Sequence, residues 1–448
     1  MCRIRLTGRC MRMDFTEYLP GEVTDKILCY LKASELSTFS CCCVTWREIS
    51  NKDNLWLHHC MKQGWMRFGL IMNTLQTDST PSPKTNISKT SPVFHMYVPD
   101  ETRLSPICKW KNVFIRVHHL MKNWEKGRYS SNLILRGHRE KVTALDCNGE
   151  CIVSGSEDKS LRFWDSRNGN CLHKLDVHSD TITKIIWKGN CIVTGCADSS
   201  IRVIDSTSKQ ILMSFQGHGG SVDHLVVIGK KIVSAATDKT LRVWSLTDRK
   251  LLHIMRGHDD DVECMFSHGN QVVTGSWDST LILWDIDKGK FIHHYTGHNE
   301  VINCCQFDDK KIISGSADCD IRIWRKSPPE CLHVLSGHEG EVYCLVFNDA
   351  VIASGSSDST VRVWSMNGKI LHVLEGHLGV VRCLYINEER LISGGDQKKI
   401  VIWDYKKGKQ MYVAHRHPTL LHLMWVDDTK LITASPERPG TITVLSFW

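Results

Sequence analysis

Short apolar segments recur through the last two thirds of the chain. They read LRFWD, IRVID, LRVWS, LILWD, IRIWR, VRVWS and IVIWD, and lie between Leu161 and Asp404. Their apolar residues are mostly β-branched or aromatic and alternate with charged or small side chains, a pattern typical of half-buried strands. Residues 132–448 are therefore predicted to consist mainly of β-strands.

A histidine recurs in step with these segments. The series is His138, His178, His218, His258, His298, His338, His377 and His417, at intervals of 40, 40, 40, 40, 40, 39 and 40 residues. A fixed period near 40 that starts with Gly-His and ends with Trp-Asp is the signature of WD repeats, each of which forms a four-stranded propeller blade. The pattern predicts an all-β propeller of eight blades over residues 132–448, and seven blades stay possible because the eighth repeat is atypical.

Each regular repeat also carries a Ser or Thr, an Asp and a Trp at fixed distances from its histidine. These sets are His138, Ser154, Asp158 and Trp164 in the first repeat, and His258, Thr274, Asp278 and Trp284 in the fourth. A single set would resemble a hydrolase triad, but recurrence at identical spacing excludes a unique active site. We expect the histidine to bridge the carboxylate and the hydroxyl, with the indole N–H donating to the hydroxyl. The chain is therefore expected not to be an enzyme.

Some repeats depart from the pattern. Ile204 replaces the Trp in the second repeat, and Gln397 replaces the Asp in the seventh, with Asp396 one position early. The eighth repeat lacks the Asp and the Trp but still contains three strand-like segments, LLHLMWV, KLITAS and TITVLSF. Leu133–Arg136 precedes the first Gly-His, where the outer strand of a blade belongs. This segment is expected to pair with Thr441–Phe447 and so close the ring.

Residues 14–65 have helical periodicity instead. Leu19-Pro20 is a good helix start, and Val23, Ile27 and Leu28 fall on one helix face. Several positions resemble the F-box motif over nearly its whole length: Leu19, Pro20, Glu22, Val23, Ile27, Leu28, Leu31, Leu36, Val44, Trp46, Leu55 and Trp56. A small all-α F-box domain ahead of WD repeats is similar to the F-box/WD-repeat substrate receptors of SCF-type cullin–RING ubiquitin ligases, and eight repeats are similar to their eight-bladed subfamily.

This resemblance implies a function and its partners. The F-box would bind the Skp adaptor and, through it, the cullin–RING core, while the propeller would bind the degron of a protein substrate for ubiquitination and proteasomal degradation. The resemblance suggests these adaptor contacts: Leu19, Pro20, Ile27, Leu28, Leu36 and Trp46. The alternative for each residue is that it fills the F-box core. The alternative for the whole chain is a WD-repeat scaffold that assembles a complex without ubiquitin transfer.

Three further segments complete the expected organisation. Residues 1–13 contain four Arg and no acid before Asp14, and are expected to form a disordered basic tail. Residues 66–106 include the Ser/Thr/Pro-rich run TDSTPSPKTNISKTSP and are expected to be a flexible insertion. Residues 107–131 contain apolar residues every three or four positions and are predicted to contain an amphipathic linker helix.

The charge distribution and the cysteine content limit the kinds of partner and the cellular compartment that are expected. Residues 1–131 carry 19 Lys and Arg against 11 Asp and Glu, whereas residues 132–448 carry 37 against 38. The propeller therefore has no overall basic character for nucleic acid, and no apolar run is long enough for a membrane helix. Twenty cysteines without a CxxC motif indicate free thiols in a cytoplasmic or nuclear protein. The spacing of Cys41-Cys42-Cys43 and His58-His59-Cys60 fits no zinc pattern, so neither a metal nor a cofactor is expected.

The substrate-binding residues are predicted by comparison with the eight-bladed subfamily. In that subfamily, degron phosphates are held by arginines five residues after the blade histidine or just before the structural Asp. Only Arg382 matches those positions here, so the arginine cluster that would clamp a phosphate is missing. We instead predict a bipolar pocket on the top face of the propeller, with acidic, basic and aromatic members: Lys141, Asp223, Asp261, Glu263, Trp277, Tyr343 and Arg382. The alternative is a solvated rim without a binding role.

Overall fold

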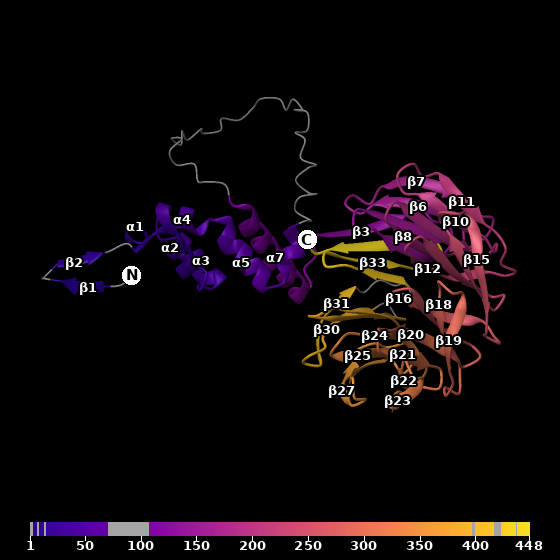
Figure 1. The fold of residues 1–448 in the computed structure, drawn as a ribbon. Coiled ribbons are helices and arrows are strands. Elements are labelled where there is room, and N and C mark those ends of the chain that lie inside the picture. The colour runs from indigo at the N-terminus through magenta and orange to yellow at the C-terminus, as the bar shows by residue number, and fades with distance from the viewer. Residues whose placement is uncertain are drawn as a thin grey trace, which may run out of the picture. The chain divides into compact units, whose positions relative to one another are not determined.

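The structure is a computed structural model of the 448-residue chain. It describes residues 3–6, 9–12, 15–69, 107–396, 399–415, 423–435 and 437–448. The chain divides into two compact units, Met1–Asn123 together with Trp448, and Trp124–Phe447. Helices make up most of the first unit and strands make up the second (Figure 1).

The second unit is a propeller of eight four-stranded antiparallel sheets. The first four are β4–β7 (Val142–Cys147, Cys151–Ser156, Ser160–Asp165, Cys171–Asp176), β8–β11 (Ile182–Lys188, Cys191–Cys196, Ile201–Asp205, Ile211–Phe215), β12–β15 (Val222–Ile228, Lys231–Ala236, Thr240–Ser245, Lys250–Arg256) and β16–β19 (Val262–His268, Gln271–Ser276, Leu281–Asp285, Lys290–Tyr295). The next three are β20–β23 (Ile302–Phe307, Lys311–Ser316, Ile321–Arg325, Glu330–Leu335), β24–β27 (Val342–Phe347, Val351–Ser356, Thr360–Ser365, Ile370–Glu375) and β28–β31 (Val381–Ile386, Leu391–Gly395, Lys399–Asp404, Lys409–His415). The prediction of eight blades is confirmed.

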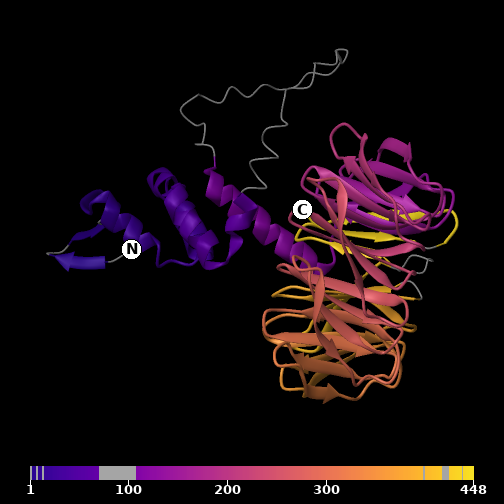
Figure 2. The same cartoon turned by 45° about the vertical axis from the view of Figure 1, so that its right-hand side comes forward.

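The eighth blade combines both ends of the propeller sequence. Its strand order is β3 (Ser131–Arg136), β34 (Thr441–Ser446), β33 (Lys430–Ala434) and β32 (Leu423–Val426). Strand β3 pairs antiparallel with β34 from Ser131 opposite Ser446 to Arg136 opposite Thr441. Figure 1 shows β3 beside the yellow strands of the C-terminal segment, and Figure 2 shows the same arrangement from a second angle. The predicted ring closure is confirmed, and it removes two unpaired strand edges.

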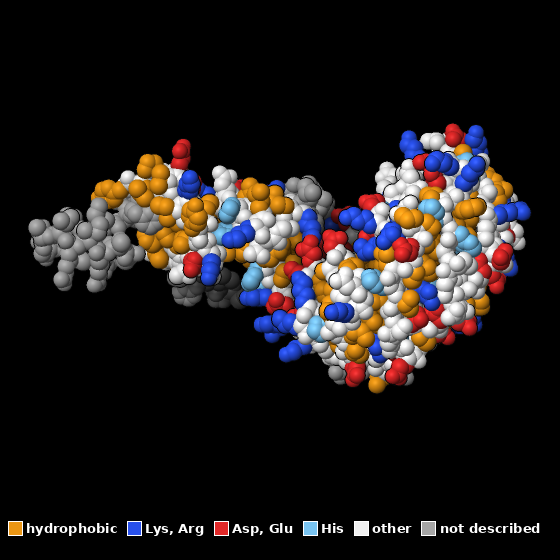
Figure 3. Space-filling view, turned by 60° about the horizontal axis from the view of Figure 1, so that its bottom comes forward, with side chains coloured by type: hydrophobic (Ala, Val, Ile, Leu, Met, Phe, Trp, Pro, Cys, Tyr) orange, Lys and Arg blue, Asp and Glu red, His pale blue; other side chains and the backbone are white. Residues whose placement is uncertain are grey.

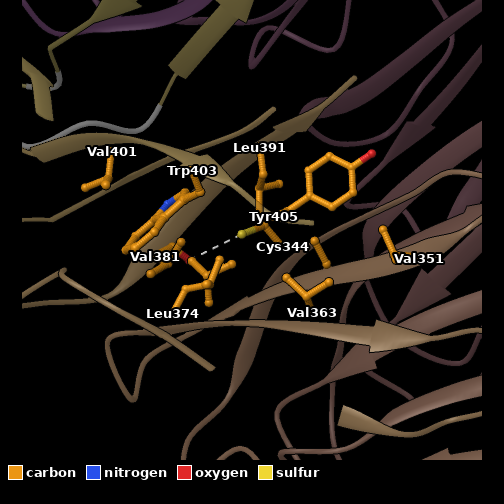
Figure 4. Packing of buried hydrophobic residues seen from close by; sticks show 11 residues of the cluster. Cys344, Val351, Val363, Leu374, Val381, Leu391, Val401, Trp403 and Tyr405 are labelled. Carbon is orange, nitrogen blue, oxygen red and sulfur yellow. Dashed lines mark hydrogen bonds between the residues drawn. The ribbon is translucent and has the colours of Figure 1, made fainter. Parts of the chain in front are cut away.

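The core of the propeller lies between neighbouring blades. Cys344 and Val363 of the sixth blade pack against Val381 and Trp403 of the seventh (Figure 4). The Cys344 thiol points toward the carbonyl oxygen of Val381, at 3.4 Å. A Cβ at Gly355 would lie 2.6 Å from Val381 Cγ1, so the glycine of the second strand is needed for close blade packing. The Cys344 thiol therefore fills a small packing site between two blades, where a free cysteine behaves as a compact apolar side chain.

Helices build the first unit. They are α1 (Phe15–Tyr18), α2 (Gly21–Leu28), α3 (Ala33–Ser40), α4 (Val44–Ser50), α5 (Asp53–Lys62), the 3-10 helix η1 (Trp65–Arg67) and α7 (Lys109–Lys126). Their core contains Leu28, Leu36, Phe39, Leu55 and Trp56. Among the described residues, no helix is long and apolar enough to cross a membrane.

Helix α7 lies within residues 107–131, where the amphipathic linker helix is expected. It ends before Gly127, which has φ +64° and is the kind of left-handed residue that terminates helices. The last turn of α7, from Trp124 onward, belongs to the propeller unit. The Trp124 ring stacks on the Phe447 ring at 3.6 Å between centroids. The Trp124 indole N–H donates to the Asp428 carbonyl at 2.8 Å.

The N-terminal segment differs from the prediction of a disordered tail. Strands β1 (Arg3–Leu6) and β2 (Arg9–Arg12) pair as an antiparallel hairpin. The sequence RIRL alternates charged and apolar residues with the two-residue period of a strand, a signal that the net basic charge obscures. Residues 70–106, which make up most of the predicted flexible insertion, lie outside the described residues.

Candidate functional site

The repeated polar residues form a buried hydrogen-bond network in each regular blade. In the first blade His138 Nδ1 lies 2.9 Å from Asp158, His138 Nε2 lies 2.7 Å from the Ser154 hydroxyl, and the Trp164 indole donates to that hydroxyl at 2.9 Å. The fourth blade repeats this geometry: His258 is 2.8 Å from both Asp278 and Thr274, and Trp284 is 2.8 Å from Thr274. These contacts support the predicted structural role of the eight residues named for the network.

The network also changes the pKa values of its members. Burial lowers the pKa of His138, and the neighbouring Asp158 only partly opposes this effect. For Asp158, desolvation would raise the pKa, but hydrogen bonds from Ser160, His138 and the Arg139 N–H outweigh it and lower the pKa to about 2. The histidine is therefore neutral and the aspartate ionised near neutral pH, which suits a hydrogen-bond bridge.

The second blade contains a cluster of potential metal-ligand atoms. His178, Cys196 and Asp198 bring their ligand atoms within 4.8 Å of one another. His178 also bonds Thr194 at 2.7 Å, and the Cys196 thiol donates to the Asp180 carbonyl at 3.3 Å. Because the repeat's own hydrogen bonds account for this arrangement, it does not indicate a metal site.

The seventh blade replaces the usual aspartate bond with an ion pair. His377 keeps its bond to Ser393 at 2.7 Å, and Trp403 donates to Ser393 at 2.7 Å. Asp396 instead accepts two hydrogen bonds from Arg382, at 3.2 Å from Nε and 3.3 Å from Nη2. The arginine predicted to bind substrate is therefore already paired with a carboxylate of its own blade.

The predicted substrate-binding residues lie at the end of the propeller where the innermost strands begin. Asp223, Glu263, Tyr343 and Arg382 are the second residues of β12, β16, β24 and β28. Trp277 follows the last residue of β17, which pairs with the first residue of β16, so it lies at the same end of the blade. We call this end the entry face.

The acidic members of the entry face are close together in the third and fourth blades. The Trp277 indole donates to Glu263 at 2.8 Å, although 56% of the Trp277 surface stays exposed. Burial raises the pKa of Asp223, Ser221 opposes that shift, and the charge of Asp261 adds to it. Among the described residues, none of the three acids forms an ion pair. This part of the face is therefore an acidic patch beside an exposed aromatic ring.

The basic members are neutralised within the fold. The Lys141 ammonium lies 3.7 Å from Glu157, and Arg382 is bound to Asp396. The Arg382 guanidinium also lies over the Tyr343 ring, 5.0 Å from its centroid. The structure thus alters the predicted bipolar pocket, because its acidic half is uncompensated whereas its basic half already has partners.

The residues predicted to contact an adaptor divide into exposed and buried groups. Leu19, Pro20 and Ile27 are exposed, whereas Leu28 and Leu36 have 0% exposure and belong to the helical core. Trp46 is half-buried and stacks on Phe39 at 4.2 Å between centroids. For Leu28 and Leu36 the core alternative therefore applies, and they cannot take part in surface contacts.

The sequence indicates Val23 and Val44 only as motif positions, and it does not single out the exposed residues Tyr18 and Tyr30 of the same unit. Tyr18 is 68% exposed and Tyr30 is 83% exposed, and Val23 and Val44 also reach the surface. Figure 3 shows apolar side chains gathered on the helical unit. The signal was the spacing of Leu19, Val23, Ile27 and Tyr30, which are three or four residues apart and lie within α2 or just beyond its two ends. We call the set Tyr18, Leu19, Val23, Ile27 and Tyr30 the α2 apolar face.

Comparison with known families agrees with this architecture. The family described as WD domain, G-beta repeat matches residues 130–165, 169–205, 209–245, 249–285, 289–325, 329–365 and 368–404, and the F-box-like family matches residues 16–62. The chain therefore belongs to the WD-repeat family and carries an F-box-like domain, which makes it an F-box/WD-repeat protein.

Individual relatives point in the same direction. F-box/WD repeat-containing protein 7 of Drosophila melanogaster is 30% identical over 37% of this chain and 11% of its own length. An F-box protein of Saccharomyces cerevisiae is 25% identical over 38% of this chain and 26% of its own length. The probable E3 ubiquitin ligase complex SCF subunit sconB of Arthroderma benhamiae is 27% identical over 37% and 25%. The matches thus span about a quarter or less of these relatives.

A solved structure supports the fold. The computationally designed Ika8 protein matches with a TM-score of 0.66 and 30% sequence identity, over 70% of this chain and 98% of its own chain. Because that protein was designed computationally, the likeness concerns the arrangement of blades and carries no information on function.

Proposed function

We propose that the chain is the non-catalytic substrate-recognition subunit of an SCF-type ubiquitin ligase. In this proposal the F-box-like unit binds the Skp adaptor and, through it, the cullin–RING core, and the entry face binds the degron of a protein substrate. The observation that carries the proposal is the α2 apolar face on a unit that matches the F-box-like family. A contiguous exposed apolar stripe is costly in an isolated monomer and is typical of an interface.

The chemistry of the entry face supports a particular kind of degron. Asp223, Asp261 and Glu263 provide uncompensated negative charge beside Trp277, an aromatic anchor of the type that dominates interfaces. Arg382 is held by Asp396 and is poorly available for a phosphate. We therefore infer a preference for a segment with basic and apolar side chains over a doubly phosphorylated one.

A binding experiment with the adaptor tests the proposal. Full-length chain carrying Leu19→Ala and Pro20→Ala should lose most co-purification of the Skp adaptor and cullin, because both residues are exposed on the F-box-like unit. Leu172→Ala is the matched control, since Leu172 is also exposed but lies on the outer strand β7 of the propeller. Substrate capture should persist in both variants. If the wild-type chain recovers no adaptor or cullin, the scaffold alternative replaces this proposal.

A further inference from the structure

Two cysteine thiols meet between the fourth and fifth blades of the propeller. Cys264 is the third residue of β16, and Cys305 is the fourth residue of β20, which are the first strands of these two blades. Their Sγ atoms lie 3.4 Å apart. The two side chains are 9% and 6% exposed and belong to the same apolar cluster. Both cysteines are free, so the two blades share an unlinked pair of thiols in contact.

The pair depends on a departure from the repeat at Cys305. In the other blades from the first to the seventh, the fourth residue of the first strand is larger and apolar: Leu145, Ile185, Leu225, Met265, Leu345 and Leu384. A cysteine at the third position elsewhere shares a cluster with a leucine of the next blade, as Cys304 does with Leu345 and Cys344 with Leu384. Among the described strands, only the boundary between the fourth and fifth blades places a third-position cysteine against a fourth-position cysteine.

The environment of the pair keeps it reduced at rest but allows a bond. The hydrogen bond with Cys264, followed by burial, raises the pKa of the Cys305 thiol well above its usual value, so the pair is a dithiol near neutral pH. Two sulfur atoms at 3.4 Å are in van der Waals contact, and a disulfide brings them only about 1.4 Å closer. Cys264 is the more exposed of the two and therefore meets an oxidant first. Because both thiols are buried, the reaction is slow and needs a small oxidant that enters between the blades.

We propose that Cys264 and Cys305 form a redox modification site, at which hydrogen peroxide converts the thiol pair into a disulfide between the two blades. The Cys264 sulfur attacks one peroxide oxygen, so an S–O bond forms, the O–O bond breaks and one water leaves. The Cys305 sulfur then attacks the sulfur of the Cys264 sulfenic acid. An S–S bond forms, the S–O bond breaks, and the departing hydroxide takes the Cys305 proton as a second water. The two thiols lose two electrons and two protons, which reduce the peroxide.

The disulfide links the strand that carries part of the acidic patch to the next blade. Glu263, which accepts the Trp277 indole N–H at 2.8 Å, directly precedes Cys264 in β16. A crosslink between Cys264 and Cys305 restricts the unfolded chain and should raise the midpoint of thermal unfolding by several degrees. Oxidation at this boundary therefore stabilises the fourth and fifth blades against separation.

Peptide mapping of the oxidised full chain tests the proposal. The chain is treated with hydrogen peroxide over a time course that continues well past complete oxidation of the exposed Cys171. Remaining thiols are blocked with N-ethylmaleimide, and unreduced peptides are analysed by mass spectrometry. A peptide that contains Cys264 linked to Cys305 should accumulate in parallel with the rise in the thermal midpoint, and dithiothreitol should reverse both changes.

Two variants and a matched control assign the bond. Cys305→Leu introduces the leucine that the sixth and seventh blades have at this position, so the fold should be retained while the linked peptide and the thermal shift are lost. Cys264→Ala copies Ala144 of the first blade and should cause the same two losses. Cys304→Ala is the control, since this cysteine is adjacent to Cys305 in the same peptide and its removal should leave both signals unchanged.

Two outcomes overturn the proposal. The first is that the wild type yields no linked peptide at the end of the time course. The second is that a peptide linked through either position persists in Cys305→Leu or Cys264→Ala. Adaptor binding and substrate capture are measured separately from disulfide formation, so neither outcome decides the proposed ligase role.

Discussion

Arg382 and Asp396 form a two-point ion pair within the seventh blade, with Nε and Nη2 of the arginine 3.2 and 3.3 Å from the two carboxylate oxygens. In the other regular blades the corresponding aspartate bonds the repeat histidine, for example Asp358 to His338 at 2.7 Å. The one-residue shift of Asp396 therefore has two consequences: the seventh network loses its usual carboxylate, and the arginine gains a counter-charge.

The first prediction follows from this pair. Asp396→Asn should leave the Arg382 charge uncompensated and increase affinity for a doubly phosphorylated serine peptide severalfold over the wild type. The stability cost should be below about 1 kcal/mol, because both side chains are partly exposed. Fluorescence anisotropy of the labelled peptide measures the affinity. Asp349→Asn, an exposed aspartate in another turn, is the control. Equal affinity for Asp396→Asn and the wild type would show that the pair does not limit phosphate binding.

The second prediction concerns the acidic patch. Charge reversal of Asp261 and Glu263 to lysine should reduce substrate capture more than Arg382→Glu, because only the acids are uncompensated. Captured proteins are quantified by mass spectrometry from cells with a blocked proteasome, and an F-box deletion increases the retained substrate. If Arg382→Glu alone abolishes capture and phosphatase treatment does the same, the entry face is a phosphate reader and the acidic interpretation is wrong.

The third prediction separates the two kinds of tryptophan in the fourth blade. Trp284→Phe removes the indole donor to buried Thr274 and should lower the free energy of unfolding by about 1–3 kcal/mol. Trp277→Phe makes the same chemical change at an exposed position and should alter stability by less than about 0.5 kcal/mol. Chemical denaturation of the full chain measures both. Equal losses would contradict the structural role assigned to the network.

More of the fold than of the binding face could be predicted from the sequence. The histidine period predicted the number of blades. The position of Leu133–Arg136 before the first Gly-His predicted the strand pairing that closes the ring. Both predictions were possible because each position of the repeat has a known place in a blade. The pairing of Arg382 with Asp396 was not predictable in this way. It depends on the side-chain geometry of a departure from the repeat, for which no spacing rule exists. The burial of Leu28 and Leu36 likewise needed the packing of all the helices.

The fourth prediction is that the propeller loses stability as the pH falls. The pKa of His138 is lowered by burial and that of His178 is lowered to about 4, so the unfolded chain binds more protons than the folded one below about pH 6.5. The lowered pKa of Asp158, about 2, continues the loss from about pH 4 downward. Urea unfolding at pH 7, 6, 5 and 4 measures the slope of the free energy of unfolding against pH. His178→Gln should flatten it between pH 6.5 and 4, and an unchanged slope in that variant would contradict the assignment.

The adaptor contact is the central claim, and a dissociation constant for the purified Skp adaptor tests it most directly. Val23 and Ile27 are exposed neighbours on α2, so Val23→Lys with Ile27→Lys introduces two charges into the α2 apolar face without entering the helical core. Surface plasmon resonance should show tight binding to the wild-type full chain and a loss of about 100-fold or more in the double variant, as expected when hot-spot contacts are replaced by unpaired charges. The Leu172→Lys control should bind like the wild type. Equal adaptor affinity for the wild type and the Val23→Lys, Ile27→Lys variant, or no affinity in either, would contradict the account.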